Sequence, residues 1–138
     1  VYEGHGRLTG AKSVSVNGDV LEADKIILNV GAWPFVPDIP GLDGVDYLTS
    51  SSKMDMDTLP EHLLIVGGSY IGLEFAQMYR RFGSRVTVVE KGDRLISRDD
   101  EDISATAKEI LENEGIDVRL NSDCISARRT GFGICFVS

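Results

Sequence analysis

Two patterns of hydrophobic and polar positions follow each other along the chain. Near the N-terminus, polar and apolar residues alternate over Ser13–Val16, and Asn17–Gly18 follows at once. Alternation that runs into Asn-Gly predicts a β-hairpin, with its return strand over Val20–Glu22. The near-continuous apolar run Lys25–Val30 is typical of a strand covered on both faces. We therefore expect the first part of the chain to be β-rich.

Residues 33–60 favour an extended, non-helical path, because they hold all four prolines of the chain. Proline fixes the backbone and lacks the N–H donor that helices and central strands need. We interpret this segment as an interdomain linker. A phosphorylation or substrate loop is the alternative, and no residue pattern supports it.

From residue 61 onward the hydrophobic period alternates between that of buried strands and that of amphipathic helices. The order is strand, helix, strand, helix, strand, over His62–Val66, Ile71–Phe82, Arg85–Glu90, a helix that begins near Asp99–Asp102 and stops at Gly115, and Ile116–Leu120. This order with short connections predicts a parallel sheet with right-handed crossovers. Residues 121–138 return to short strands, with a turn over residues 130–133.

Composition and charge narrow the class of protein. The chain has 138 residues, of which 42% are hydrophobic and 26% charged, as in an ordinary soluble domain. Its net charge of −8 disfavours nucleic acid as a partner. No apolar run approaches the ~18–20 residues that cross a bilayer, so we expect no membrane association. The N-terminus lacks the features of a signal peptide, which favours a cytoplasmic location.

Cysteine and histidine usage points away from a disulfide scaffold and from a metal site. Cys124 and Cys135 are the only cysteines, which fits a reducing compartment. His5 and His62 are isolated from them in the sequence, and no zinc-ligand spacing is present. We expect two ordinary core thiols and no bound metal.

A glycine-rich turn joins the first predicted strand to its helix. In the dinucleotide fingerprint Gly-x-Gly-x-x-Gly, Gly67 and Gly72 hold the first and third positions, and Ser69 replaces the second glycine. Serine is the smallest chiral polar replacement, and its hydroxyl could donate to a phosphate oxygen. The helix that opens after Gly68 presents unpaired N–H groups and a positive dipole end, which suit a pyrophosphate. A turn that binds nothing is the alternative.

Glu90 ends the second strand, close to the ~20-residue spacing at which an acid binds the ribose in this motif. A carboxylate there accepts hydrogen bonds from the ribose hydroxyls of NAD and repels the 2′-phosphate of NADP. We therefore expect NAD in preference to NADP. Lys91 and Arg94 follow and could pair with the adenosine end or with nearby acids. A merely solvated acid at position 90 is the alternative.

At this point the sequence resembles a known family. The segment GGSYIGLEFAQMYRRFGSRVTVVE is similar to the NAD-binding core of the pyridine nucleotide–disulfide oxidoreductases, such as dihydrolipoamide dehydrogenase, glutathione reductase and mercuric reductase. Upstream, ILNVGAWPFVPDIPGLDG resembles the junction between their FAD domain and their NAD domain. Its sequence looks closest to that of the mercuric-reductase-like members. The resemblance implies an α/β fold, in which a Rossmann-like parallel-sheet NAD-binding domain (residues 53–138) is flanked by a β-rich part of an FAD-binding domain and a linker (residues 1–52).

The resemblance also implies roles for single residues. At the junction between the two domains, this sequence retains the family's glycine as Gly31, near the flavin, whereas Val30 replaces the usual threonine. The resemblance places Tyr70 over the flavin, movable for nicotinamide, and Glu74 at the nicotinamide end. Judged without the resemblance, Tyr70 is a partly buried aromatic residue and Glu74 a surface acid. The expected cofactor-binding residues are Gly31, Gly67, Gly68, Ser69, Tyr70, Ile71, Gly72, Glu74, Glu90 and Lys91.

The resulting hypothesis is an internal segment of an oxidoreductase that uses FAD and NAD. Hydride would pass from NADH to the flavin and on to a disulfide or metal-ion acceptor. The family's redox cysteine pair and acid/base pair have no counterpart here, so we expect no catalytic residue in this segment and no activity from it alone. The family implies a homodimer formed through a domain absent here. Alternatives are an NADH oxidase, a ferredoxin reductase-like flavoprotein or a non-catalytic nucleotide-binding module.

Overall fold

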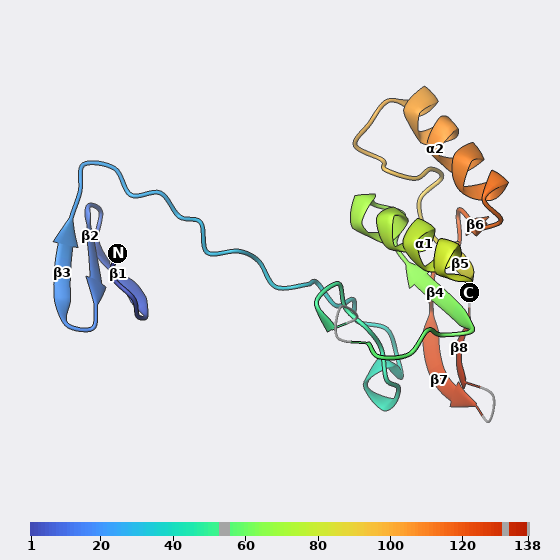
Figure 1. The fold of residues 1–138 in the computed structure, drawn as a ribbon, viewed down its shortest axis with the longest axis horizontal. Coiled ribbons are helices and arrows are strands. Elements are labelled where there is room, and N and C mark those ends of the chain that lie inside the picture. Colours follow the sequence, from blue (N-terminus) through green and yellow to red (C-terminus); the bar gives the residue numbers. More distant parts are fainter. Residues whose placement is uncertain (53–55, 131–132, 138) are drawn as a thin grey trace. The chain divides into compact units, whose positions relative to one another are not determined.

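The computed structural model describes residues 1–52, 56–130 and 133–137 and divides into two compact units, Val1–Trp33 and Pro34–Ser138 (Figure 1). The division falls between Trp33 and Pro34, upstream of the boundary expected after residue 52. The assignment of the two parts to an FAD-binding and an NAD-binding domain stays a prediction. None of the described helices is long and apolar enough to cross a membrane.

The first unit is a three-stranded antiparallel meander. It consists of β1 (Gly6–Gly10), β2 (Ser13–Val16) and β3 (Asp19–Glu22). The β2–β3 turn places Asn17 and Gly18 at positive φ, as the Asn-Gly signal requires. The predicted hairpin is confirmed.

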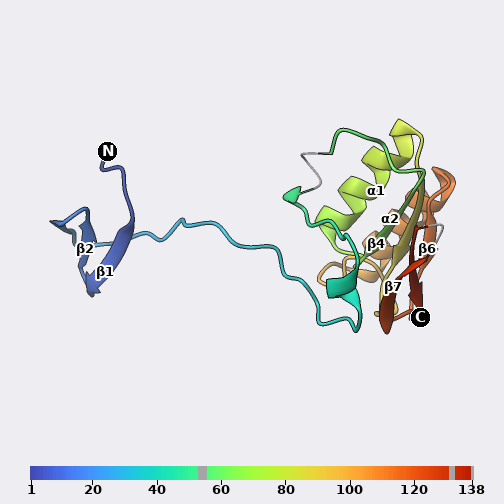
Figure 2. The same cartoon turned by 90° about the horizontal axis from the view of Figure 1, so that it is seen from below.

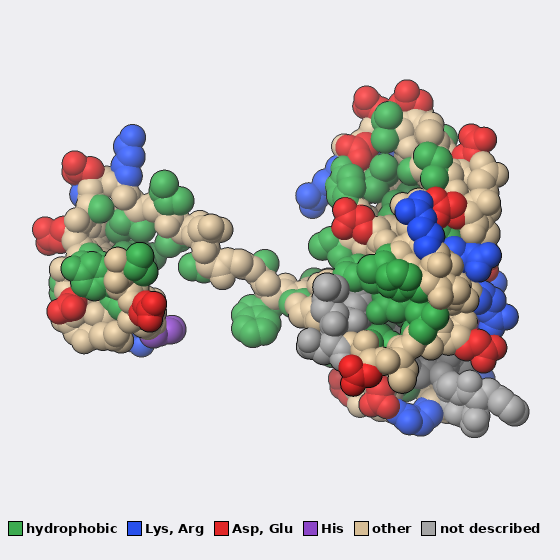
Figure 3. Space-filling view, viewed as in Figure 1, with side chains coloured by type: hydrophobic (Ala, Val, Ile, Leu, Met, Phe, Trp, Pro, Cys, Tyr) green, Lys and Arg blue, Asp and Glu red, His purple; other side chains and the backbone are tan. Residues whose placement is uncertain are grey.

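The strand expected over Lys25–Val30 is wrong for this structure, in which the segment is extended but unpaired. Ile27 is 89% exposed and Val30 88%. Figure 3 shows apolar side chains projecting from this part of the chain. A strand buried on two faces needs neighbouring strands for its backbone groups and cover for its side chains, and the described residues supply neither.

The second unit contains the expected parallel sheet. Its elements are β4 (His62–Val66), α1 (Tyr70–Phe82), β5 (Arg85–Val89), α2 (Glu101–Asn113) and β6 (Asp117–Arg119), with strand order β4-β5-β6. Both helices pack on one face of the sheet (Figures 1 and 2). The core between them is lined by Leu63, Ile65, Leu73, Ala76, Tyr79, Val86, Val88, Ala107, Leu111 and Val118.

Local signals explain where these helices begin and end. Gly83, at φ 110°, ends α1 by closing its last turn onto the carbonyls of Tyr79 and Arg80. Two acids, Glu101 and Asp102, lie in the first turn of α2, where the helix dipole favours negative charge. The predicted strand–helix alternation is confirmed.

On the opposite face of the sheet, part of the segment interpreted as a linker is packed against the second unit. Ile39, Leu42 and Val45 are buried and pack with Val89 of β5 and with residues of the C-terminal part. Leu42 belongs to the short helix η1 (Leu42–Gly44). Apolar side chains between the prolines therefore tie this segment to the second unit. Residues 53–55 of the expected linker lie outside the described residues.

The C-terminal part forms the hairpin β7 (Ser126–Thr130) and β8 (Gly133–Val137). Residues 131–132 of the expected turn lie outside the described residues. Ala127 donates its N–H to the carbonyl of Pro40 at 2.8 Å, and Arg129 pairs with Asp46. The hairpin is thus joined to the segment that carries η1.

Candidate functional site

The glycine turn lies at the carboxyl end of β4. Gly67 has φ 108°, a conformation that favours glycine, and its N–H donates to the carbonyl of Val89 at 2.8 Å. No atom lies within 4 Å of the position that a Cβ of Gly67 would take, so a ligand can approach the backbone there. Ser69 is the N-cap of α1 and makes no side-chain capping bond. The first-turn N–H groups of α1 have no partner within the helix.

Gly72 brings the helix close to the turn. A Cβ on Gly72 would lie 2.5 Å from the carbonyl oxygen of Gly67 and 3.3 Å from Cγ2 of Ile65. Only glycine fits at that approach, which is the role of the third glycine in the dinucleotide fingerprint.

Glu90 points at the turn and not into solvent. Its Oε2 accepts the N–H of Gly68 at 2.7 Å, and its Oε1 accepts the N–H of Gly92 at 2.7 Å. Each carboxylate oxygen keeps a further lone pair for another donor, such as a ribose hydroxyl. The structure therefore disfavours the alternative of a merely solvated acid, and it places the carboxylate beside the glycine turn.

Tyr70 and Glu74 lie one turn apart on α1 and border a groove of about 220 Å³ between α1 and α2. The side chain of Tyr70 is half exposed, and its hydroxyl donates to the carboxylate of Asp99. This hydrogen bond raises the pKa of Tyr70 above its ordinary value, with smaller contributions from burial and from the Asp99 charge. The expected shared helix face is confirmed, and the contact with nicotinamide stays a prediction.

The structure gathers most of the expected site. It brings together the turn, the first turn of α1 and the carboxylate, which are Gly67, Gly68, Ser69, Tyr70, Ile71, Gly72 and Glu90. Lys91 is exposed beside Glu90. Gly31 belongs to the first unit, at φ 72°, and its contact with flavin stays a prediction.

Three residues at the turn were missed by the sequence analysis. Leu95 is fully buried, and a Cβ on Gly68 would lie 2.5 Å from its Cδ2. Ile96 donates its N–H to the carbonyl of Gly68 at 2.8 Å. The carboxylate of Asp99 accepts a hydrogen bond from the hydroxyl of Tyr70. The apolar pair Leu95–Ile96 stands in an otherwise polar connection, which indicated that the pair is buried. The sequence did not indicate that it would contact the backbone at Gly68.

The cysteine described in full has no catalytic environment. Cys124 is buried among apolar residues, and burial, helped by the charge of Asp123, raises the pKa of its thiol. A thiol with a raised pKa is a poor nucleophile at neutral pH. Among the described residues, no three His, Cys, Asp or Glu side chains are grouped so as to hold a metal ion.

Comparison with protein families decides the kinship. Residues 1–132 match the family model of pyridine nucleotide-disulphide oxidoreductases. The chain belongs to this family. Its members are FAD-dependent enzymes that use NAD(P)H, and the open glycine turn with its adjacent carboxylate fits the pyridine nucleotide.

Three relatives show how the chain compares with other members of the pyridine nucleotide-disulphide oxidoreductase family. It is 47% identical over 114 residues to a mercuric reductase of Streptomyces lividans, covering 83% of this chain and 24% of that protein. It is 35% identical to a dihydrolipoyl dehydrogenase of Acholeplasma laidlawii, and the match covers 86% of this chain and 36% of that protein. The solved structure of the HOCl-induced flavoprotein disulfide reductase RclA of Escherichia coli superposes with a TM-score of 0.80 at 34% identity. The superposition covers 98% of this chain and 32% of that structure's chain. The chain thus spans between 24% and 36% of the length of these relatives.

Proposed function

We propose that this chain is the NAD(H)-binding segment of an FAD-dependent oxidoreductase. The pyrophosphate lies against the Gly67–Gly72 turn, and the carboxylate of Glu90 accepts hydrogen bonds from the hydroxyls of the adenosine ribose. The observation that carries this proposal is the 2.7 Å hydrogen bond between Gly68 and Glu90, because it brings the phosphate-binding turn and the ribose-binding acid to one place. Residues 1–52 are proposed to belong to the FAD-binding domain and residues 53–138 to the NAD-binding domain.

The carboxylate of Glu90 and the engagement of Arg94 favour NAD over NADP. Arg94 is already engaged, since its guanidinium donates to the carbonyl of Ser97 at 3.2 Å and pairs with Glu101 at 3.3 Å. The 2′-phosphate of NADP would add negative charge beside the carboxylate of Glu90. The exposed Lys91 stays a candidate contact for the adenosine end.

In the intact protein that carries this chain, Tyr70 and Glu74 are proposed to contact the nicotinamide end. The flavin, when bound, would accept the hydride and pass the electrons on to a disulfide or metal-ion acceptor. The chain positions the dinucleotide and contributes no catalytic side chain of its own. The 47% identity to a mercuric reductase favours a metal ion as the acceptor.

A selectivity measurement tests the proposed site. NAD⁺ and NADP⁺ are titrated by calorimetry into the intact protein and into its Glu90→Gln variant. We expect tighter binding of NAD⁺ by the wild type and a roughly tenfold lower NAD⁺/NADP⁺ affinity ratio in the variant, since hydrogen bonds to a charged group contribute ~1.5–3 kcal/mol.

The affinity ratio separates recognition from damage to the turn. A change that only loosens the turn weakens both cofactors alike, because both carry the same pyrophosphate. Glu109→Gln, at an exposed position of α2, is the matched control and should leave both affinities unchanged. Absence of NAD⁺ binding by the wild type, or an unchanged ratio in Glu90→Gln, would contradict the proposed function.

A further inference from the structure

The connection between β5 and α2 contacts the glycine turn at three points besides the carboxylate of Glu90. Leu95 fills the space over Gly68, whose missing Cβ would lie 2.5 Å from the leucine. Ile96 donates its N–H to the carbonyl of Gly68 at 2.8 Å. The Asp99 carboxylate accepts the hydroxyl of Tyr70, the first residue of α1. The connection therefore contacts both the turn and the first turn of the helix.

The backbone of this connection is strained at Ile96. This residue has φ 38°, a left-handed conformation that β-branched side chains rarely adopt. Such a conformation persists only where the surrounding contacts over-determine it. Here Ile96 is 8% exposed, its N–H is bonded to Gly68, and its carbonyl accepts the N–H of Asp99 at 2.9 Å. Contacts with the turn thus hold the connection in place.

The hydrogen bond between Tyr70 and Asp99 is the outermost of these contacts. Tyr70 directly follows Ser69, whose neighbouring N–H groups are proposed to face the pyrophosphate. Asp99 directly precedes Asp100, the N-cap of α2. The bond therefore links the beginning of α1 to the beginning of α2, and its tyrosine borders the groove between the two helices.

We propose that Asp99 is a positioning residue for dinucleotide binding, which acts through the hydroxyl of Tyr70 to hold the β5–α2 connection against the glycine turn. The inference rests on the proposed function. Because the arrangement is formed before the ligand arrives, binding needs less ordering of the turn, and preorganisation of this kind raises affinity. Loss of the bond weakens binding although Asp99 itself does not touch the dinucleotide.

A double-mutant cycle on the intact protein tests this role. The dissociation constant for NAD⁺ is measured for wild type, Tyr70→Phe, Asp99→Ala and the double variant. Tyr70→Phe keeps the ring and removes only the hydroxyl. We expect each single change to raise the dissociation constant roughly three- to tenfold, and the double change to raise it no further than the larger single one.

Two further variants separate the bond from charge and folding. Asp99→Asn keeps an oxygen that accepts the hydroxyl and should restore most of the affinity. Asp100→Ala removes the same charge one residue along, where the side chain makes no capping bond, and should leave the affinity unchanged.

The titration of Tyr70, followed by NMR on ¹³C-labelled tyrosine, reports the bond directly. Asp99→Ala should lower the pKa of Tyr70 toward its ordinary value, whereas Asp100→Ala should not; the charge of Arg98, which lowers this pKa, is the same in both variants. Wild-type protein that binds NAD⁺ while the single effects are absent or additive would overturn the positioning role alone. Wild-type protein that does not bind NAD⁺ would overturn the proposed function and this inference with it.

Discussion

At the scale of single residues, Gly72 shows how close contact reverses an intrinsic preference. Inside an exposed helix, alanine is favoured over glycine by ~1 kcal/mol. In α1, however, the added Cβ would lie 2.5 Å from the Gly67 carbonyl oxygen, a backbone atom that cannot rotate away. We expect Gly72→Ala to lower the free energy of unfolding by ~1–3 kcal/mol, as overpacking does, and to weaken NAD⁺ binding.

Urea unfolding followed by circular dichroism measures this change. Gly44→Ala is the control, because no atom lies within 4 Å of its added Cβ, and the expected effect is within about 0.5 kcal/mol. A free energy of unfolding that is equal or higher in Gly72→Ala would show that the helix does not approach the turn as closely as the structure has it.

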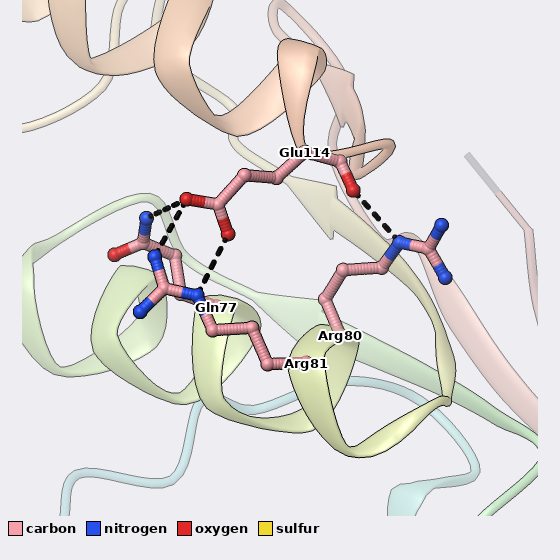
Figure 4. Close-up of polar contacts among 4 residues, drawn as sticks. All are labelled: Gln77, Arg80, Arg81 and Glu114. Atoms are coloured by element: carbon pink, nitrogen blue, oxygen red, sulfur yellow. Dashed lines mark hydrogen bonds and ion pairs between the residues drawn. The ribbon is translucent and has the colours of Figure 1, made fainter.

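At the scale of elements, polar side chains join the C-terminal ends of α1 and α2 (Figure 4). The carboxylate of Glu114, the C-cap of α2, accepts hydrogen bonds from Gln77 at 2.7 Å and from Arg81 at 2.6 Å. Its backbone carbonyl accepts from Arg80 at 2.9 Å. The bond from Arg81 holds the pKa of Glu114 below its ordinary value, against the opposing effect of burial.

The sign of this shift gives a pH dependence. A carboxylate whose pKa is lowered by folding stabilises the folded state above its ordinary pKa, and the contribution is lost as the pH falls through the folded value. Glu114→Gln should therefore be less stable than wild type at pH 7, and the difference should shrink toward acid pH. Thermal unfolding across that range, with the exposed Glu109→Gln as control, measures it. A difference that is constant with pH would contradict the role of the charge.

Elements whose signals are local could be predicted from the sequence, and those that depend on distant partners could not. The strands and helices of residues 62–119 follow from hydrophobic period and from a glycine at a helix end. The burial of Ile39 depends on Val89 and Cys124, which no local pattern reveals. The positive φ of Ile96 contradicts its local preference, because contact with Gly68 decides it. The glycine turn and Glu90 were predictable, whereas the contact of Asp99 was not.

At the scale of the whole molecule, the segment on either side of the boundary between the two units carries several exposed apolar side chains. Trp33 is 96% exposed and Phe35 89%, and this segment includes the run in which a strand was expected. Exposed apolar residues in such number mark a surface that normally meets other protein. Since the chain spans 24% of its mercuric reductase relative, we propose that the remainder of the intact protein covers this segment.

Trp33 is the chain's single tryptophan, so its fluorescence tests this proposal without a label. In the isolated 138-residue chain, we expect the emission of a fully hydrated indole and quenching by acrylamide as efficient as for free tryptophan. In the intact protein, the signal assigned by subtracting that of Trp33→Phe should move to shorter wavelength and resist acrylamide, because a covered indole loses its contact with water. Equal quenching in both would mean that the segment stays open in the intact protein, and that its apolar side chains serve a surface other than the protein interior.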